Sequence, residues 1–209
     1  MGNGIAHVLA SHGFNVSLFD IAQPALDKAM GTIQKNLDRQ VSKEMYTAEE
    51  AQAALGRIQC FIDLDAALRQ ADLVIEAATE REELKLQIFR DLDSKAPAGC
   101  ILASNTSSIS IGKIAAVTQR PELVIGMHFM NPVPVMKLVE IIRGYKTSNA
   151  TTDAVIELSK ALGKTPIACH DYPGFVANRI LMPMINEAIE TLQTGVAGVA
   201  EIDGIMKLG

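Results

Sequence analysis

The residues best suited to chemistry are a histidine, a glutamate and a serine near the ends of three separate apolar runs. His128 lies in LVIGMHFMN, Glu140 lies in KLVEIIR after the turn NPVP, and Ser107 lies in the turn that follows CILASN. An imidazole has an ordinary pKa of about 6.5, which suits reversible proton transfer near neutral pH. If the two strands are antiparallel neighbours, Glu140 can accept a hydrogen bond from His128 and fix its tautomer. The competing interpretation of His128 is a satisfied histidine in the core.

Ser107 admits two interpretations of its own. It could cap the short helix expected after it, as serines commonly do, or Ser108 or Ser110 could take that role. In the second case Ser107 would lie across the same crevice as His128. With His128 and Glu140 it also suggests a Ser-His-Glu hydrolase, but no GxSxG-type elbow surrounds it.

The start of the chain suggests a nucleotide site. Gly2 lies in Met-Gly-Asn-Gly, which opens a helical pattern, and Asp20 closes the next apolar run, NVSLFD. Glycines at a helix N-terminus let backbone N–H groups and the helix dipole face a phosphate. An acidic residue at the end of the following strand can accept hydrogen bonds from an adenosine ribose and repel a 2′-phosphate. Both features also occur in proteins without a nucleotide site.

The elements that must position these residues alternate between strand and helix. Short Val/Ile/Leu runs separated by helical patterns predict an α/β fold with a doubly wound, mostly parallel sheet and helices on both faces. The expected strands are 15–20, 60–62, 72–77, 100–105, 123–131, 137–143 and 164–170. The expected helices are 2–13, 24–43, 47–58, 64–70, 82–96, a short one after 110, 151–162, 175–195 and a last one near the end. Helices take over after Pro173, so we divide the chain into domains 1–171 and 172–209.

Composition limits the classes of function. The 209 residues are 48% hydrophobic and 21% charged, which excludes wholesale disorder. The net charge of −5 argues against a nucleic-acid partner. No apolar run suits a transmembrane helix, and no basic stretch opens a signal peptide. We therefore expect a cytoplasmic protein with no membrane partner.

The cysteines and the remaining histidines give weaker signals. The three cysteines lie far apart without any CxxC pair, so we expect no metal site and buried, reduced thiols. His7, His12 and His170 show no partner pattern, and we interpret them as structural or surface residues.

Four stretches resemble the 3-hydroxyacyl-CoA dehydrogenase family, particularly its short bacterial members of the 3-hydroxybutyryl-CoA type. They are AATEREELK (77–85), SNTSS (104–108), HFMNPVPVMKLVEII (128–142) and DYPGFVANRIL (171–181), and the similarity covers essentially the whole chain. The resemblance implies an NAD-binding Rossmann-type domain over 1–171 and the beginning of a helical C-terminal domain over 172–209. It further implies NAD-linked, reversible oxidation of an L-3-hydroxyacyl-CoA to the 3-ketoacyl-CoA, by a homodimer.

The resemblance also implies roles for individual residues. His128 would be the general base, oriented by Glu140. The other expected contacts, in chain order, are Gly2, Asp20, Glu80, Lys85, Ser107 and Asn131 for the cofactor, Asn36, Lys43 and Ser107 for the CoA substrate, and Asn178 with Ser107 in catalysis. From the residues alone, Glu80 and Lys85 could equally be a solvated helix start, and Asn178 part of a polar helix face.

The chain departs from the family pattern at both ends. Met1 coincides with the position before the third glycine of the family's Gly-x-Gly-x-x-Gly, and the last residues stop inside the helical domain. We therefore expect lost backbone pairing where the family's first strand would lie, and an exposed apolar face on the 175–195 helix, including Leu181, Ile185 and Leu192. Such a chain would bind NADH poorly, turn over slowly and self-associate. Alternative functions are a dehydrogenase of another 3-hydroxy acid and a crystallin-like structural relative.

Overall fold

Strands and helices alternate through the computed structural model, which describes residues 1–209. The strands are β1 (Val16–Phe19), β2 (Ile58–Phe61), β3 (Leu73–Glu76), β4 (Ile101–Ser104), β5 (Val124–Phe129), β6 (Leu138–Arg143) and β7 (Thr165–His170). The helices are α1 (Gly2–Ser11), α2 (Gln23–Ser42), α3 (Ala48–Gly56), α4 (Leu64–Leu68), α5 (Glu82–Lys95), α6 (Ile111–Ala115), α7 (Asn149–Ala161), α8 (Ala177–Gln193) and α9 (Val199–Leu208). Every expected element is present, and the sequence missed only the 3₁₀ turn η1 (Pro121–Leu123). The chain divides into two units, Met1–Asp171 and Tyr172–Gly209.

The strands of the first unit form two sheets. β1 and β2 pair in parallel, and the other five strands have the order β3-β4-β5-β6-β7. All pairs are parallel except β5 with β6, which is antiparallel. No strand pairing joins β1 to β3.

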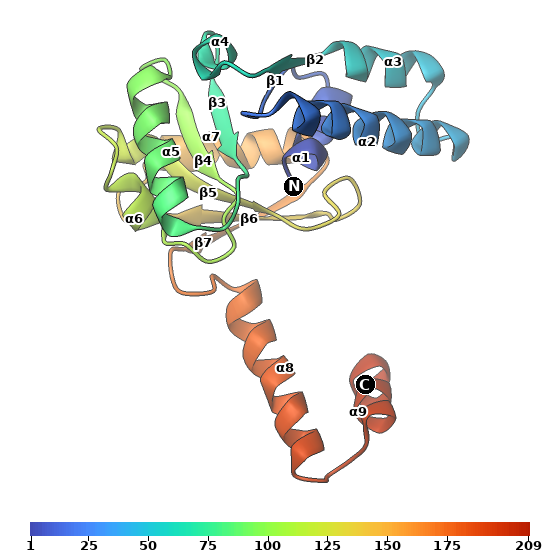
Figure 1. The fold of residues 1–209 in the computed structure, drawn as a ribbon. Helices are drawn as coiled ribbons and strands as arrows, with labels where there is room; N and C mark the ends of the chain where they lie inside the picture. Colours follow the sequence, from blue (N-terminus) through green and yellow to red (C-terminus); the bar gives the residue numbers. More distant parts are fainter. The chain divides into compact units, whose positions relative to one another are not determined.

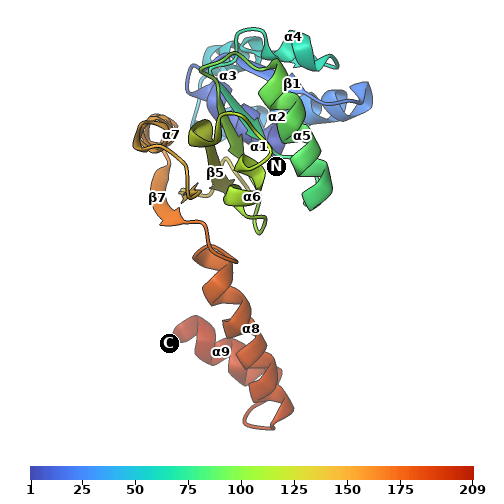
Figure 2. The same ribbon diagram turned by 90° about the vertical axis from the view of Figure 1, so that its left-hand side faces the viewer.

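Helices cover both faces of the larger sheet, and α1 joins the two sheets. Figure 2 shows α5 and α6 on one side of β5 and α7 on the other. Ile5 and Val8 of α1 belong to the apolar cluster of β5, β6 and α7, whereas Ala6 and Ala10 pack with α2 and α3. The first helix therefore presents a different face to each half of the core (Figure 1).

The long helix α2 forms a hairpin with α3. Pro24 lies in the first turn of α2, where its missing N–H costs nothing. α3 begins with the predicted capping box, in which Thr47 and Glu50 each bond the other's backbone N–H at 3.1 and 2.8 Å.

The second unit consists of α8 and α9, which have no buried residues. Leu181, Ile185 and Leu192 of α8 are 42%, 44% and 41% exposed, as the sequence predicts. Pro183 lies inside this helix. No helix in the structure combines the length and the apolar character that crossing a membrane requires.

The expectation of three buried cysteines is wrong for two of them. Only Cys100 is buried, and burial raises the pKa of its thiol to about 11. Cys60 is exposed, because it lies on β2 at the edge of the two-stranded sheet. Cys169 is half-buried on β7, the edge strand of the larger sheet.

Gly126 allows β5 and β6 to approach closely at the Gly126–Ile142 pair, two pairs along the strands from His128 and Glu140. A Cβ built at Gly126 would lie 2.8 Å from Cβ of Ile142 and 3.0 Å from Cδ1 of Ile111. Gly126→Ala should therefore lower the free energy of unfolding by about 1–3 kcal/mol, because the extra carbon overpacks the sheet. Urea denaturation measures this change.

Gly31→Ala is the matched control. Gly31 lies inside α2 with nothing near its added Cβ, so the substitution should raise the free energy of unfolding by about 0.5–1 kcal/mol. Equal changes in the free energy of unfolding for the two substitutions would show that the glycine at position 126 is not required by the close approach of β5 and β6.

Candidate active site

His128 and Glu140 face each other across the antiparallel β5–β6 pair. The strand register places them directly opposite, and His128 Nδ1 lies 2.8 Å from Glu140 Oε2. Both residues are buried, at 7% and 4% exposure. Because a carboxylate only accepts hydrogen bonds, this contact places a proton on Nδ1 and directs Nε2 toward any reacting group.

Ser107 completes the arrangement from the turn after β4. Its Oγ lies 3.1 Å from His128 Nε2. Ser110, not Ser107, caps α6 by accepting from the N–H of Lys113. Ser107 is therefore part of the crevice with His128.

Glu80 holds the turn that carries Ser107. Its Oε1 accepts hydrogen bonds from the Oγ1 of Thr106, the backbone N–H groups of Ser107 and Ser108 at 2.9 and 3.1 Å, and the Oγ of Ser108 at 3.0 Å. Burial raises the pKa of the Glu80 carboxyl, but these hydrogen bonds and the charge of Lys85 outweigh burial and lower it. The carboxylate is thus stabilised in its charged form at the mouth of the site.

Lys85 lies beneath this turn, fully buried. Its Nζ is 2.7 Å from Glu76 Oε1, 3.4 Å from Glu80 Oε2 and 3.2 Å from the carbonyl oxygen of Ala78. The side chain has 0% exposure, so in this structure its ammonium faces protein carboxylates instead of the cofactor that we expected it to contact. A direct contact between Lys85 and the cofactor stays a prediction. In the structure Lys85 forms ion pairs with Glu76 and Glu80.

The sequence analysis missed the buried polar residues that hold the turn after β4 in place. Glu76 accepts a hydrogen bond from Ser104 Oγ at 2.7 Å, and Asn105 Oδ1 accepts from the backbone N–H of Phe129 at 2.9 Å. All three polar side chains are buried. A charged residue closing an apolar strand, as in LVIE, is the signal that could have identified Glu76.

The amino end of α1 fits a dinucleotide phosphate. No side chain caps this helix and no acidic residue lies in its first turn. Its first intrahelical hydrogen bonds run from the N–H groups of Gly4 and Ile5 to Met1, so the N–H of Gly2 remains for an anion. Asp20 follows β1, and its Oδ1 accepts from the N–H of Ala22 at 3.0 Å, which leaves Oδ2 for a ribose.

Other expected contacts lie on separate elements. Asn131 is exposed in the loop directly after β5. Asn36 lies on α2, and Lys43 follows the last residue of that helix, seven residues after Asn36. Asn178 lies near the start of α8 in the second unit, and its role stays a prediction.

Comparisons with known proteins agree with this architecture. Residues 1–172 match the model for the NAD-binding domain of 3-hydroxyacyl-CoA dehydrogenase, and residues 174–209 match the model for its C-terminal domain. The chain is 53% identical over 209 residues to a 3-hydroxybutyryl-CoA dehydrogenase of Bradyrhizobium diazoefficiens, covering 100% of this chain and 71% of that protein.

A second relative and a solved structure show the same similarity. A probable 3-hydroxybutyryl-CoA dehydrogenase of Bacillus subtilis is 48% identical, covering 100% of this chain and 72% of that protein. The crystal structure of (S)-3-hydroxybutyryl-CoA dehydrogenase from Ralstonia eutropha has a TM-score of 0.97 and 52% identity, covering 100% of this chain and 74% of that one.

The fold and the site together define a dinucleotide-dependent dehydrogenase of the doubly wound α/β class. The chain belongs to the 3-hydroxyacyl-CoA dehydrogenase family.

The hydrogen bonds to Glu80 predict how stability depends on pH. Since folding lowers the pKa of this carboxyl, its stabilising effect is present above its ordinary pKa and is lost as pH falls through the lower, folded value. Glu80→Gln should therefore lower the free energy of unfolding at pH 6–8, and the difference from the parent should shrink below about pH 4. Urea denaturation across this pH range measures it.

Glu83→Gln is the control, because Glu83 is exposed in the first turn of α5 and forms no ion pair. It should give a smaller difference at neutral pH. A Glu80→Gln difference that stays constant down to pH 3, or that Glu83→Gln reproduces in full, would contradict the role given to the hydrogen bonds.

Proposed function

We propose that this protein catalyses the NAD-linked, reversible oxidation of a short-chain L-3-hydroxyacyl-CoA to the 3-ketoacyl-CoA. The observation that carries the proposal is the hydrogen-bonded series Ser107–His128–Glu140 at the carboxyl end of β5, in a chain of this family. Relatives at 53% and 48% identity are named as 3-hydroxybutyryl-CoA dehydrogenases, which supports the short acyl chain.

His128 acts as the general base in the proposed reaction. Its Nε2 takes the proton of the substrate hydroxyl, and Glu140 stabilises the imidazolium that results. Ser107 lies close enough to Nε2 to donate a hydrogen bond to the same substrate oxygen. In the reverse direction the same Nε2 returns the proton to the ketone oxygen.

NAD, when bound, supplies a two-electron acceptor at its nicotinamide ring. The N–H of Gly2 at the amino end of α1 would face the pyrophosphate, and Asp20 would accept from the adenosine ribose. Glu80 and Asn131 flank the crevice in which the nicotinamide end would lie, on the turns after β3 and β5. The chain's own task is to hold this cofactor beside Nε2 of His128.

The CoA end is proposed to lie along α2. Lys43 is exposed, and its ammonium suits a phosphate as a point charge. Asn36 lies seven residues earlier, on α2. A homodimer and a cytoplasmic location are proposals of the same kind, carried by the family resemblance.

A hydrolase would use the same three side chains as a nucleophile, base and orienting acid. Two observations favour the dehydrogenase. Ser107 lies in a turn held by Glu80 and followed by Ser108, not in a strand-to-helix elbow between glycines. The match of residues 1–172 to an NAD-binding domain also has no use in a simple hydrolase.

NADH consumption with acetoacetyl-CoA tests the function, and free acetoacetate is the comparison substrate. The CoA ester should be strongly preferred. His128→Gln should lower kcat by roughly 10²–10⁴-fold with little change in the KM for NADH, because it removes proton transfer and leaves the cofactor site intact.

His170→Gln is the matched control, since His170 is an exposed histidine on β7, and it should leave kcat unchanged. Glu140→Gln should also lower kcat and move the acidic limb of the pH–rate profile. Near-normal kcat in His128→Gln would end the assignment of the base, and a preference for free acetoacetate would favour the dehydrogenase of another 3-hydroxy acid.

Cofactor choice is predicted to depend on Asp20. Asp20→Ser should weaken NADH binding and relatively improve NADPH, because it removes both the ribose acceptor and the charge that repels a 2′-phosphate. The ratio of kcat/KM for the two cofactors measures this change. Asp63→Ser is the control, because Asp63 follows β2 and makes a similar bond to the N–H of Asp65 at 3.0 Å. If the ratio of kcat/KM for the two cofactors is the same in Asp20→Ser as in the control, Asp20 does not select the cofactor and only caps the turn after β1.

A further inference from the structure

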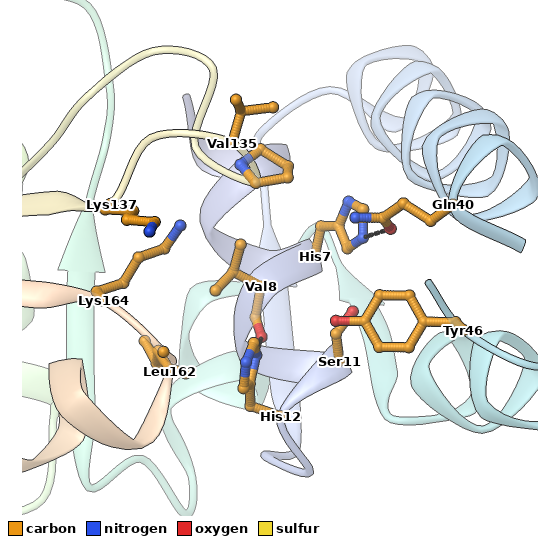
Figure 3. Close-up of a pocket in the computed structure, with 12 residues that line it drawn as sticks. His7, Val8, Ser11, His12, Gln40, Tyr46, Val135, Lys137, Leu162 and Lys164 are labelled. Carbon is orange, nitrogen blue, oxygen red and sulfur yellow. Dashed lines mark hydrogen bonds between the residues drawn. The ribbon is translucent and has the colours of Figure 1, made fainter. Parts of the chain in front are cut away.

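The side chain of Lys164 holds the loop that joins β5 to β6. Lys164 lies in the turn between α7 and β7, and its ammonium points toward this loop (Figure 3). Its Nζ donates hydrogen bonds to the carbonyl oxygens of Val133 at 2.5 Å and Met136 at 2.8 Å. One cation therefore joins two points of the loop to a separate part of the chain.

The loop, residues 130–137, has few donors of its own. Two of its residues are prolines, which lack a backbone N–H group. The N–H groups of Val135 and Met136 both bond the carbonyl oxygen of Pro132, at 3.0 Å each. The carbonyl oxygens of Val133 and Met136 instead receive hydrogen bonds from the lysine. The conformation of the loop therefore depends on a donor that lies outside it.

The surroundings of Lys164 indicate that these carbonyl oxygens are its main partners. Burial lowers the pKa of the Lys164 ammonium, and no neighbouring carboxylate raises it. A partly buried charge needs hydrogen bonds to offset its lost hydration. The two carbonyl oxygens supply them without neutralising the charge.

On its inner side the loop packs against the amino end of α1. Val133 is 3% exposed and belongs to the same apolar cluster as Ile5 and Val8 of α1. A Cβ built at Gly4 would lie 3.0 Å from Cβ of Val133, so the loop and the helix are in close contact. Asn131 lies in the same loop, two residues before Val133. The loop thus connects the helix end proposed for the pyrophosphate with a residue proposed for the nicotinamide end.

The pair His128 and Glu140 is held in a different way. It belongs to the antiparallel ladder in which residues 126–129 pair with residues 139–142. Neither Val133 nor Met136 is part of this ladder. Loss of the hydrogen bonds from Lys164 should therefore disturb the loop and leave the proton-transfer pair in register.

We propose that Lys164 is a positioning residue for the cofactor. By bonding the carbonyl oxygens of Val133 and Met136, it holds the loop in the conformation that packs on α1 and presents Asn131 to the crevice. The inference rests on the cofactor contacts proposed above for Gly2 and Asn131. It assigns Lys164 to cofactor affinity and not to the chemical step.

Fluorescence titration of the intact chain with NADH tests this role without turnover. The protein contains no Trp, so the emission of NADH itself reports binding. Lys164→Met keeps an unbranched side chain and removes the donor. It should weaken NADH binding by about 5- to 20-fold, the effect of losing charge-assisted hydrogen bonds. With acetoacetyl-CoA, the KM for NADH should rise in the same proportion, while kcat should stay within about twofold of the parent.

Lys137→Met is the matched control. Lys137 borders the same cavity beside α1 as Lys164 does (Figure 3), but its side chain is exposed. Its loss removes an equal charge and should change NADH affinity less than about twofold. Lys164→Arg keeps a cation with several donors, so it should return the affinity to within about threefold of the parent.

Two results would overturn the proposal. One is a folded Lys164→Met variant with unchanged NADH affinity, or with a loss that Lys137→Met reproduces, because the charge alone would then explain it. The other is a kcat that falls as far as the affinity, because the loop would then support the whole site. Urea denaturation establishes that each variant is folded in the assay. If Lys164→Met does not fold, Lys164→Gln, whose side chain is one bond shorter, takes its place in the same comparisons.

The two proposals fail in distinguishable ways. A parent chain that binds NADH but does not convert acetoacetyl-CoA would contradict the proposed function. The effect of Lys164→Met on NADH binding would still test the positioning role.

Discussion

The antiparallel pairing of β5 with β6 is the constraint on which the rest of the site depends. Side chains alternate between the two faces of a strand, so a slip of one residue would turn Glu140 away from His128. Gly126 permits the close approach of the two strands in this register, because any larger residue there would meet Ile142. Once this register is set, the buried carboxylate fixes the imidazole tautomer without any contribution from a loop.

Buried charged residues also help to position the turn that carries Ser107. Glu76 and Lys85 lie under the turn after β4 with 3% and 0% exposure of their side chains. Charges so deeply buried are tolerated because each has several partners, and loss of one partner would leave the other uncompensated. The ammonium of Lys85 also forms an ion pair with Glu80. Glu80 in turn accepts hydrogen bonds from the backbone N–H groups of Ser107 and Ser108. The serine that faces His128 is thus supported by a network that begins two strands away.

Helix α1 is in contact with several parts of the protein. One side of α1 packs on the larger sheet and another on the α2–α3 hairpin. Its amino end is open to a phosphate, and Gly4 lets it approach Val133 in the loop after β5, since a Cβ there would lie 3.0 Å from Cβ of Val133. On the side next to the hairpin, His7 bonds Gln40 of α2 at 3.0 Å.

The sequence by itself determined the order of elements, the α/β class, the family and the candidate pair His128 and Glu140. Apolar periodicity, capping residues and dense local motifs are encoded over short stretches, so one chain is enough to read them. Only the tertiary structure decided that β5 and β6 run antiparallel in the register that joins the pair, that Lys85 is buried beside two glutamates, and that His7 bonds Gln40 of α2. These facts depend on contacts between residues far apart in the chain. No local pattern specifies which distant side chain will be the partner.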